Sequence, residues 1–152
     1  MDTRKAFQLT PIVLALGLLV AFSGCSTNSD IEETQKARKT RIACVGDSIT
    51  YGARLKNRSR NSYPAQLQQL LGDRYEVTNL GVGGSTLIRK GSPNVWSQIK
   101  KIEEAEPDIV VVSLGTNDTC GGRRACWDHK DEFPGDYRDL VDTLRALPSE
   151  PR

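Results

Sequence analysis

Three short motifs in this chain carry residue types that could act together on a carbonyl compound. Residues 46–50 read GDSIT, residues 79–84 read NLGVGG, and residues 115–118 read GTND. A serine hydroxyl is a nucleophile once a neighbouring base activates it. A backbone N–H group or an asparagine amide can donate to the negative oxygen that develops during acyl transfer. Because each motif follows a short apolar run, the three together indicate acyl-transfer chemistry at the ends of strands.

Each motif taken alone also has an ordinary structural explanation. Gly46 and Asp47 are typical of a tight turn, and an asparagine after Gly-Thr often stabilises a turn. The first motif has Thr50 where the nucleophile elbow G-x-S-x-G has glycine, so an α/β-hydrolase elbow is not indicated. The second has Thr86 where the fingerprint G-x-G-x-x-G has its last glycine, so dinucleotide binding is not indicated. The functional interpretation therefore depends on the three motifs acting at one place.

The segments between the motifs alternate between strand and helix patterns. This alternation predicts an α/β fold with a doubly wound parallel sheet, in which about three strands are present. The unbroken β-branched run before the third motif is typical of a central strand covered on both faces. Ligands of such sheets collect beyond the carboxyl ends of the strands, and all three motifs fall there. The expected strands are residues 41–46, 75–80 and 108–114, and the expected helices are residues 63–71, 95–105 and 137–147.

In this order, the three motifs resemble those of the SGNH hydrolases, the GDSL esterase/lipase family, and the resemblance spans residues 41–152. It implies a flavodoxin-like three-layer α/β/α sandwich. It also implies that Ser48 is the nucleophile and that Gly84 and Asn117 form the oxyanion hole. The implied reaction is hydrolysis of a carboxylic ester through a serine acyl-enzyme, which requires no cofactor.

Residues 127–148 resemble a branch of this family that groups sialate O-acetylesterase-like enzymes. This resemblance implies a small-molecule or carbohydrate ester as the substrate, with O-acetyl groups favoured over long-chain lipid. The Trp127, Glu132-Phe133 and Asp136-Tyr137 positions and the Leu-Arg-Ala-Leu-Pro run at 144–148 carry the resemblance.

The family's fourth motif, Asp-x-x-His, supplies the base and its orienting acid, and it is absent from this sequence. The one histidine, His129, is either a substitute base helped by Asp128 or Asp131, or a loop residue ahead of the last helix. The second interpretation is favoured, because the family places its histidine after further strands. The sequence is therefore interpreted as the N-terminal portion of a C-terminally truncated esterase, with an apolar edge at 108–114 left unpaired. The alternative is a catalytically inactive fragment, or a remnant that still binds esters or carbohydrates.

The N-terminus predicts export. Arg4 and Lys5 precede an apolar run at residues 11–22, which is shorter than the roughly 20 residues that span a bilayer but suits a signal peptide. Ser23 and Gly24 then precede Cys25, as in a bacterial lipoprotein signal, although Phe22 departs from the leucine usually found there. The expectation is a signal peptide at 1–24, a lipidated Cys25 and a polar tether over 25–40. It places the protein on an envelope membrane, in the periplasm or at the outer surface, while an ordinary secretory signal is the alternative.

The remaining cysteines and the net charge bear on three further possibilities: a disulfide, a metal site and nucleic-acid binding. Cys44 lies in an apolar run and is expected to be buried. Cys120 and Cys126 could form a loop disulfide in an exported protein, or with His129 a sparse metal array. The disulfide is favoured, because zinc sites have tighter spacing and a fourth ligand. The formal net charge of +2 does not indicate nucleic-acid binding.

Overall fold

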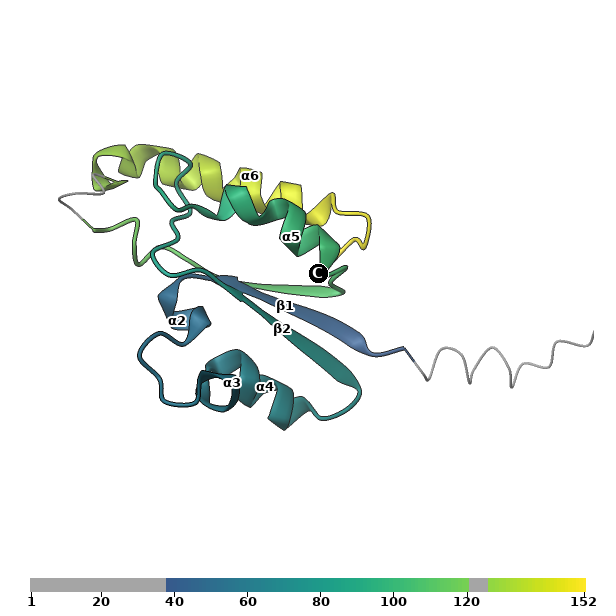
Figure 1. Cartoon of the computed structure of the whole chain (residues 1–152). Helices are drawn as coiled ribbons and strands as arrows, with labels where there is room; N and C mark the ends of the chain where they lie inside the picture. Colours follow the sequence, from purple (N-terminus) through teal and green to yellow (C-terminus); the bar gives the residue numbers. More distant parts are fainter. Residues whose placement is uncertain (1–37, 121–125) are drawn as a thin grey trace, which may run out of the picture.

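The computed structural model describes residues 38–120 and 126–152. Its sheet has three parallel strands, β1 (Thr40–Gly46), β2 (Tyr75–Gly81) and β3 (Ile109–Ser113), in the order β2-β1-β3. Figure 1 shows helices on both faces of this sheet. The predicted α/β fold and its parallel sheet are confirmed.

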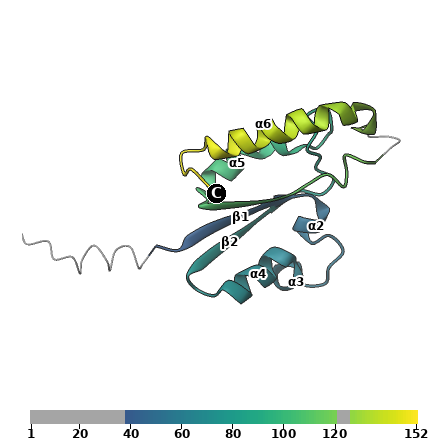
Figure 2. The ribbon, with the colours of Figure 1, turned by 180° about the vertical axis from the view of Figure 1, so that it is seen from behind.

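Two helical layers enclose the sheet. The helices α3 and α4 cover one face, and α5 and α6 cover the other, as the view from behind also shows (Figure 2). The short helix α2 lies at the carboxyl end of β1, where the first motif is. The helical segments are α2 (Ser48–Tyr51), α3 (Arg58–Asn61), α4 (Tyr63–Leu71), η1 (Val95–Gln98), α5 (Ile99–Glu104), η3 (Cys126–Glu132) and α6 (Phe133–Arg145).

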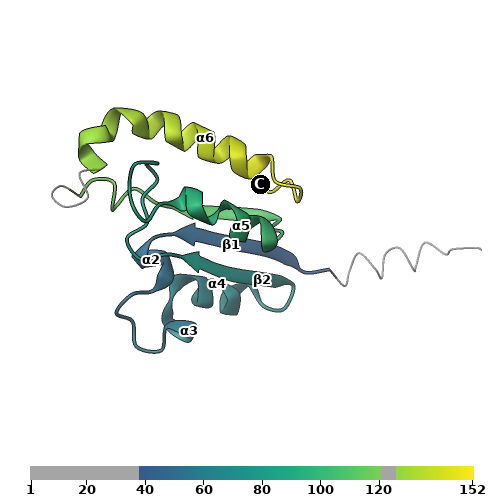
Figure 3. The ribbon, with the colours of Figure 1, turned by 45° about the horizontal axis from the view of Figure 1, so that its top comes forward.

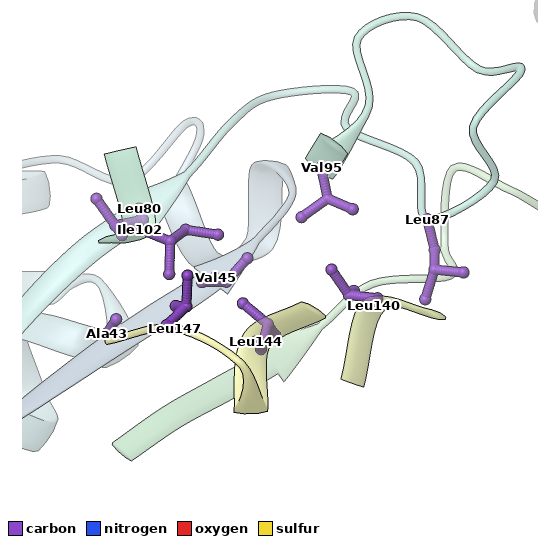
Figure 4. Close-up of a cluster of buried hydrophobic side chains, with 9 residues drawn as sticks. All are labelled: Ala43, Val45, Leu80, Leu87, Val95, Ile102, Leu140, Leu144 and Leu147. Carbon is purple, nitrogen blue, oxygen red and sulfur yellow. The ribbon is translucent and has the colours of Figure 1, made fainter. Parts of the chain in front are cut away.

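The hydrophobic core fills the space between the sheet and the layer formed by α5 and α6. Leu144 of α6 and Ile102 of α5 lie close to Val45 of β1 (Figure 4). Leu140 of α6 lies nearer Leu87 and Val95 in the same cluster. The predicted helix at 137–147 begins earlier than expected, at Phe133, with a proline in its first turn. In the tilted view of Figure 3, α5 and α6 lie beside each other and run roughly along the strands.

The prediction that residues 108–114 form the central strand is wrong. Among the described strands, β1 is central and is buried from Ile42 to Gly46. The side chain of Val111 in β3 is 36% exposed, because the helices on its face lie under β1 and β2. The outer edge of β3 is paired at its start, where Val110 N–H donates to the Arg152 carbonyl and Arg152 N–H donates to the Asp108 carbonyl, both at 3.0 Å. A β-branched run is therefore compatible with an edge position.

The predicted signal peptide and Cys25 lie outside the described residues, as does most of the predicted tether. Within the described residues, contacts with the sheet begin before Arg41, since Arg38 makes an ion pair with Asp108 at 2.6 Å and Thr40 opens β1. Within residues 38–120 and 126–152, no helix has the length and hydrophobicity needed to cross a membrane.

Candidate active site

The register of the sheet brings the three motifs level with one another. Gly46, the last residue of β1, is paired with Gly81 of β2 on one side and with Ser113 of β3 on the other. The turns that follow the strands therefore start from the same edge. Ser48, Gly84 and Asn117 all line one cavity of about 660 Å³ beyond this edge.

Ser48 is the first residue of α2, and Asp47 holds it there. The Asp47 carboxylate is 1% exposed and accepts a hydrogen bond from the Ile49 N–H at 2.8 Å, which caps the helix. Gly52 ends the helix in the left-handed conformation at φ 81°. The Ser48 side chain is thus presented on a single helical turn at the end of the central strand.

Glycine is required at the end of β2 because α2 rests directly on it. A Cβ atom on Gly81 would lie 2.2 Å from the Tyr51 backbone nitrogen. Asn79 closes the same contact, because its amide donates to the Thr50 carbonyl at 2.9 Å and its oxygen accepts from the Gly81 N–H at 3.0 Å. Sequence reasoning gave Asn79 no role, although it opens the NLGVGG motif.

The second and third motifs meet at Asn117. Its side-chain nitrogen donates to the Asp47 carboxylate at 3.2 Å and to the Ser85 carbonyl at 3.0 Å. Because both partners only accept hydrogen bonds, the orientation of the amide is fixed with its nitrogen toward them. Gly84 lies one residue before Ser85, is buried and has a left-handed backbone with φ 82°. The two expected oxyanion donors are therefore held next to each other.

Sequence reasoning missed Asp118, the next residue in the GTND motif. Asp118 is 1% exposed, and its carboxylate accepts from the Leu87 N–H at 3.0 and 3.1 Å and from the Ile88 N–H at 2.7 Å. A buried carboxylate needs such donors, since an unpaired buried charge is costly. The only signal in the sequence was an acidic residue directly after the asparagine at the end of a strand.

His129 does not lie at the Ser48 cavity. It belongs to η3, where its Nδ1 is 3.2 Å from Glu132 Oε1, and the same oxygen accepts from the Lys90 ammonium at 2.6 Å. The hydrogen bond from Lys90 is the main cause that lowers the pKa of Glu132 below its ordinary value. Within the described residues, the lining of the Ser48 cavity contains no histidine. His129 therefore precedes α6 but lies in the helical segment η3 rather than in a loop.

The structure describes three cysteines, of which Cys44 is buried and Cys120 and Cys126 are not bonded to each other. Cys44 is buried in β1, and burial raises the pKa of its thiol. The expected disulfide is not formed in the structure: Cys120 is exposed, with its Sγ 3.6 Å from the Thr116 carbonyl, and Cys126 is buried. No group of three potential metal ligands occurs in the part of the chain that the structure describes.

The fold is of the flavodoxin-like α/β class, and a serine follows the central strand of its sheet at the edge of the cavity. Residues 44–152 match the profile of the GDSL-like lipase/acylhydrolase family, and the chain belongs to this family. One relative, an acetylxylan esterase from Xylanibacter ruminicola (strain ATCC 19189 / DSM 19721 / CIP 105475 / JCM 8958 / 23), is 38% identical over 113 residues, which are 73% of this chain and 23% of that protein. The chain thus spans less than a quarter of that relative's length.

Solved structures share the fold. The TesA structure superposes with a TM-score of 0.58 at 23% identity, covering 74% of this chain and 57% of that one. A native aryl esterase from M. smegmatis superposes with a TM-score of 0.58 at 22% identity, covering 74% and 59%. The sialate O-acetylesterase-like branch stays a prediction.

Proposed function

We propose that this protein is an exported esterase that removes O-acetyl groups from carbohydrate through an acyl-enzyme on Ser48. The observation that carries the proposal is the single cavity lined by Ser48, Gly84 and Asn117, one residue from each motif. A nucleophile beside donors from two other loops is the arrangement that acyl transfer requires. Membership of an acylhydrolase family supports the reaction class.

In the proposed reaction, the Ser48 hydroxyl oxygen bonds to the acetyl carbonyl carbon and its proton passes to a base. The electron pair of the C=O bond moves to oxygen, where the backbone N–H of Gly84 and the amide of Asn117 stabilise the charge. The C=O bond then re-forms as the C–O bond to the sugar breaks, and the departing sugar oxygen takes the proton from the base. Water releases acetate from Ser48 by the same steps. Asn117 would share a hydrogen between the oxyanion and Asp47, since its bond to Asp47, at 3.2 Å, is the longer of its two.

We propose that His129 is not the base of this reaction. Its ring nitrogen faces Glu132, within a surface group that also includes Lys90. A His129→Ala variant should therefore keep the activity of the unmodified protein. A loss as large as that of a Ser48 variant would show that His129 is the base. The intact mass and the C-terminal peptide sequence of the protein from its host would show whether an Asp-x-x-His motif is joined to these residues.

Two observations favour a carbohydrate ester. The first observation is that one relative is named an acetylxylan esterase. The other is a second cavity of about 340 Å³ that borders the same turn after β3, where it is lined by Gly115 and Asp118 and also by Trp127 and Phe133. The Trp127 side chain is 49% exposed, and an exposed indole offers an apolar face to the C–H side of a sugar ring.

Replacement of the proposed nucleophile tests the function. Ser48→Ala should lower acetate release from acetylated xylan by at least about 10³-fold, because the acyl-enzyme cannot form. Ser59→Ala is the matched control: this serine lies in α3, and its hydroxyl bonds only to Asn57 among the described residues. Hydrolysis that survives in Ser48→Ala would overturn the proposal.

Export and anchoring belong to the same proposal. The apolar run at 11–22 and the Ser-Gly-Cys sequence ending at Cys25 support a lipid-modified N-terminus. In the native host, Cys25→Ala should move the protein from the membrane fraction to the soluble fraction. The mature N-terminal peptide should begin at Cys25, and its mass should show that this cysteine is diacylated. An unmodified peptide would contradict the anchor.

A further inference from the structure

The loop after β2 is held by carboxylates that come from other parts of the chain. Asp118, in the turn after β3, accepts hydrogen bonds from the consecutive backbone N–H groups of Leu87 and Ile88. Asp136 of α6 accepts from the next one, Arg89 N–H, at 2.9 Å. Three neighbouring amides are therefore bound by two buried acidic side chains.

Asp118 differs from Asp136 in its neighbour. Asn117 precedes it in the chain and donates to the carbonyl of Ser85 at 3.0 Å. The adjacent residues Asn117 and Asp118 thus hold the same loop at Ser85 and at residues 87–88, through one donor and one acceptor. Gly84 is covalently joined to Ser85, so its N–H is placed by these bonds.

We propose that Asp118 is a positioning residue that fixes the distance between the two oxyanion donors, the Gly84 N–H and the Asn117 amide. This inference rests on the proposed function. Asp118 makes no direct contact with the reacting atoms in this scheme. It acts through the loop that carries Gly84, on one side, and through the turn that carries Asn117, on the other. Donors stabilise a developing oxyanion best when their positions are set before the reaction.

The chemistry of the bonds explains why a carboxylate is needed. An ionised carboxylate only accepts hydrogen bonds and can serve two N–H donors at once, and charge-assisted bonds are short. An asparagine at this position has one acceptor and one donor end. Oδ1 of Asp118 accepts from both the Leu87 and Ile88 N–H groups, and Oδ2 also accepts from Leu87. In Asp118→Asn, the NH2 group that replaces Oδ2 would face the Leu87 N–H, and the loop would move away from Asn117.

The experiment compares Asp118→Asn with Asp136→Asn as the matched control. Both variants weaken a bond to the same loop, but Asp136 is not adjacent to an oxyanion donor, and its carboxylate otherwise pairs with the Arg89 guanidinium at 3.2 Å. For each variant, kcat, KM and the thermal midpoint are measured with an acetyl ester. The rate at which a phosphonate ester modifies Ser48 is measured as well, because its adduct places an oxygen in the oxyanion hole.

We expect Asp118→Asn to lower kcat and the phosphonate rate by about 10-fold to 100-fold, somewhat less than the loss of a whole donor, with KM changed less than twofold. Asp136→Asn should lower the thermal midpoint and leave kcat unchanged. Equal falls of kcat in both variants, or no fall in Asp118→Asn, would overturn the inference.

If Asp118→Asn does not fold, Asp118→Glu keeps the charge while its extra methylene displaces the carboxylate, and the same comparison applies. The proposed function fails separately, through residual activity in Ser48→Ala. A Ser48-dependent reaction that is indifferent to Asp118 would overturn only the positioning role.

Discussion

The Asn117 amide donates to the Asp47 carboxylate over 3.2 Å, and this bond joins the turn after β3 to the residue that precedes Ser48. The other oxygen of the same carboxylate caps α2. One buried side chain therefore sets both the start of the helix that presents the serine and the position of the asparagine amide. These two functions can be separated by mutation.

We expect Asp47→Asn and Asp47→Ala to differ in stability more than in activity. The asparagine variant could keep the helix cap, since asparagine caps as well as aspartate, but the new amide would face the Asn117 amide. Asp47→Ala loses the cap too, at a cost of about 1 kcal/mol. Both variants should lose activity, and urea unfolding should show the larger stability loss for alanine. Full activity in Asp47→Asn would contradict the role of this bond.

Two neighbouring glycines should respond differently to alanine. In Gly81→Ala, the new methyl group would overlap the Tyr51 backbone and push α2 away from the sheet. Overpacking of this kind costs about 1–3 kcal/mol. Gly83→Ala is the control, because nothing lies within 4 Å of the added atom. Thermal unfolding of both variants tests the prediction, and equal midpoints would count against the contact between α2 and β2.

Leu140 should contribute far more to stability than Leu70. Leu140 is fully buried between α6 and the sheet, whereas Leu70 of α4 is 84% exposed. Leu140→Ala should lower the free energy of unfolding by about 2–5 kcal/mol, and Leu70→Ala should change it by less than about 0.5 kcal/mol. Denaturant titrations would measure both. A similar loss in the two variants would mean that another element covers α4.

The free energy of unfolding should decrease at alkaline pH. Burial raises the pKa of the Cys44 thiol and of the Tyr63 phenol above their ordinary values. Such groups stabilise the folded state below their unfolded pKa values, about 8.5 and 10. This stabilisation is lost as pH rises from the unfolded pKa values through the higher folded pKa values. In that range the unfolded state has released protons that the folded state retains.

Urea unfolding between pH 7 and pH 10.5 measures this decrease. Cys44→Ala should reduce the slope between pH 8.5 and 9.5, and Tyr63→Phe should reduce it nearer pH 10. Slopes that match the unmodified protein in both variants would show that other groups cause the decrease.

The sequence predicted those elements whose limits are set by local residues. The helix at 63–71 has the predicted bounds, since Pro64 starts it and Gly72 follows it. The expected helix at 95–105 instead divides into η1 and α5, with Asn94 capping the first part. The four-residue helices α2 and α3 are too short to show a hydrophobic period. The position of β3 in the sheet depends on long-range pairing that no local pattern records.

The candidate site divides in the same way. Ser48, Gly84 and Asn117 were identified because each follows a strand in a short motif, and the structure places all three at one cavity. A local hydrogen bond of Asp47 in its turn was expected, and the bond from Ile49 N–H is one. The bond of Asp47 to Asn117 and the contacts of Asn79 and Asp118 could not be predicted, since each joins segments that are distant in sequence or depends on the exact path of a turn. The disulfide between Cys120 and Cys126, expected from their positions and the predicted export, is not formed in the structure.

Gly46 pairs with both Gly81 and Ser113, so the register of the sheet sets the distances between the three motifs of the site. A slip of β1 by one residue would carry Ser48 about 3.3 Å past the other two motifs and turn the buried face of the strand outward. No loop in the site could compensate for such a shift. Assembly of the cavity and formation of the sheet are therefore one event. A chain in which the sheet has not formed would therefore lack the site altogether.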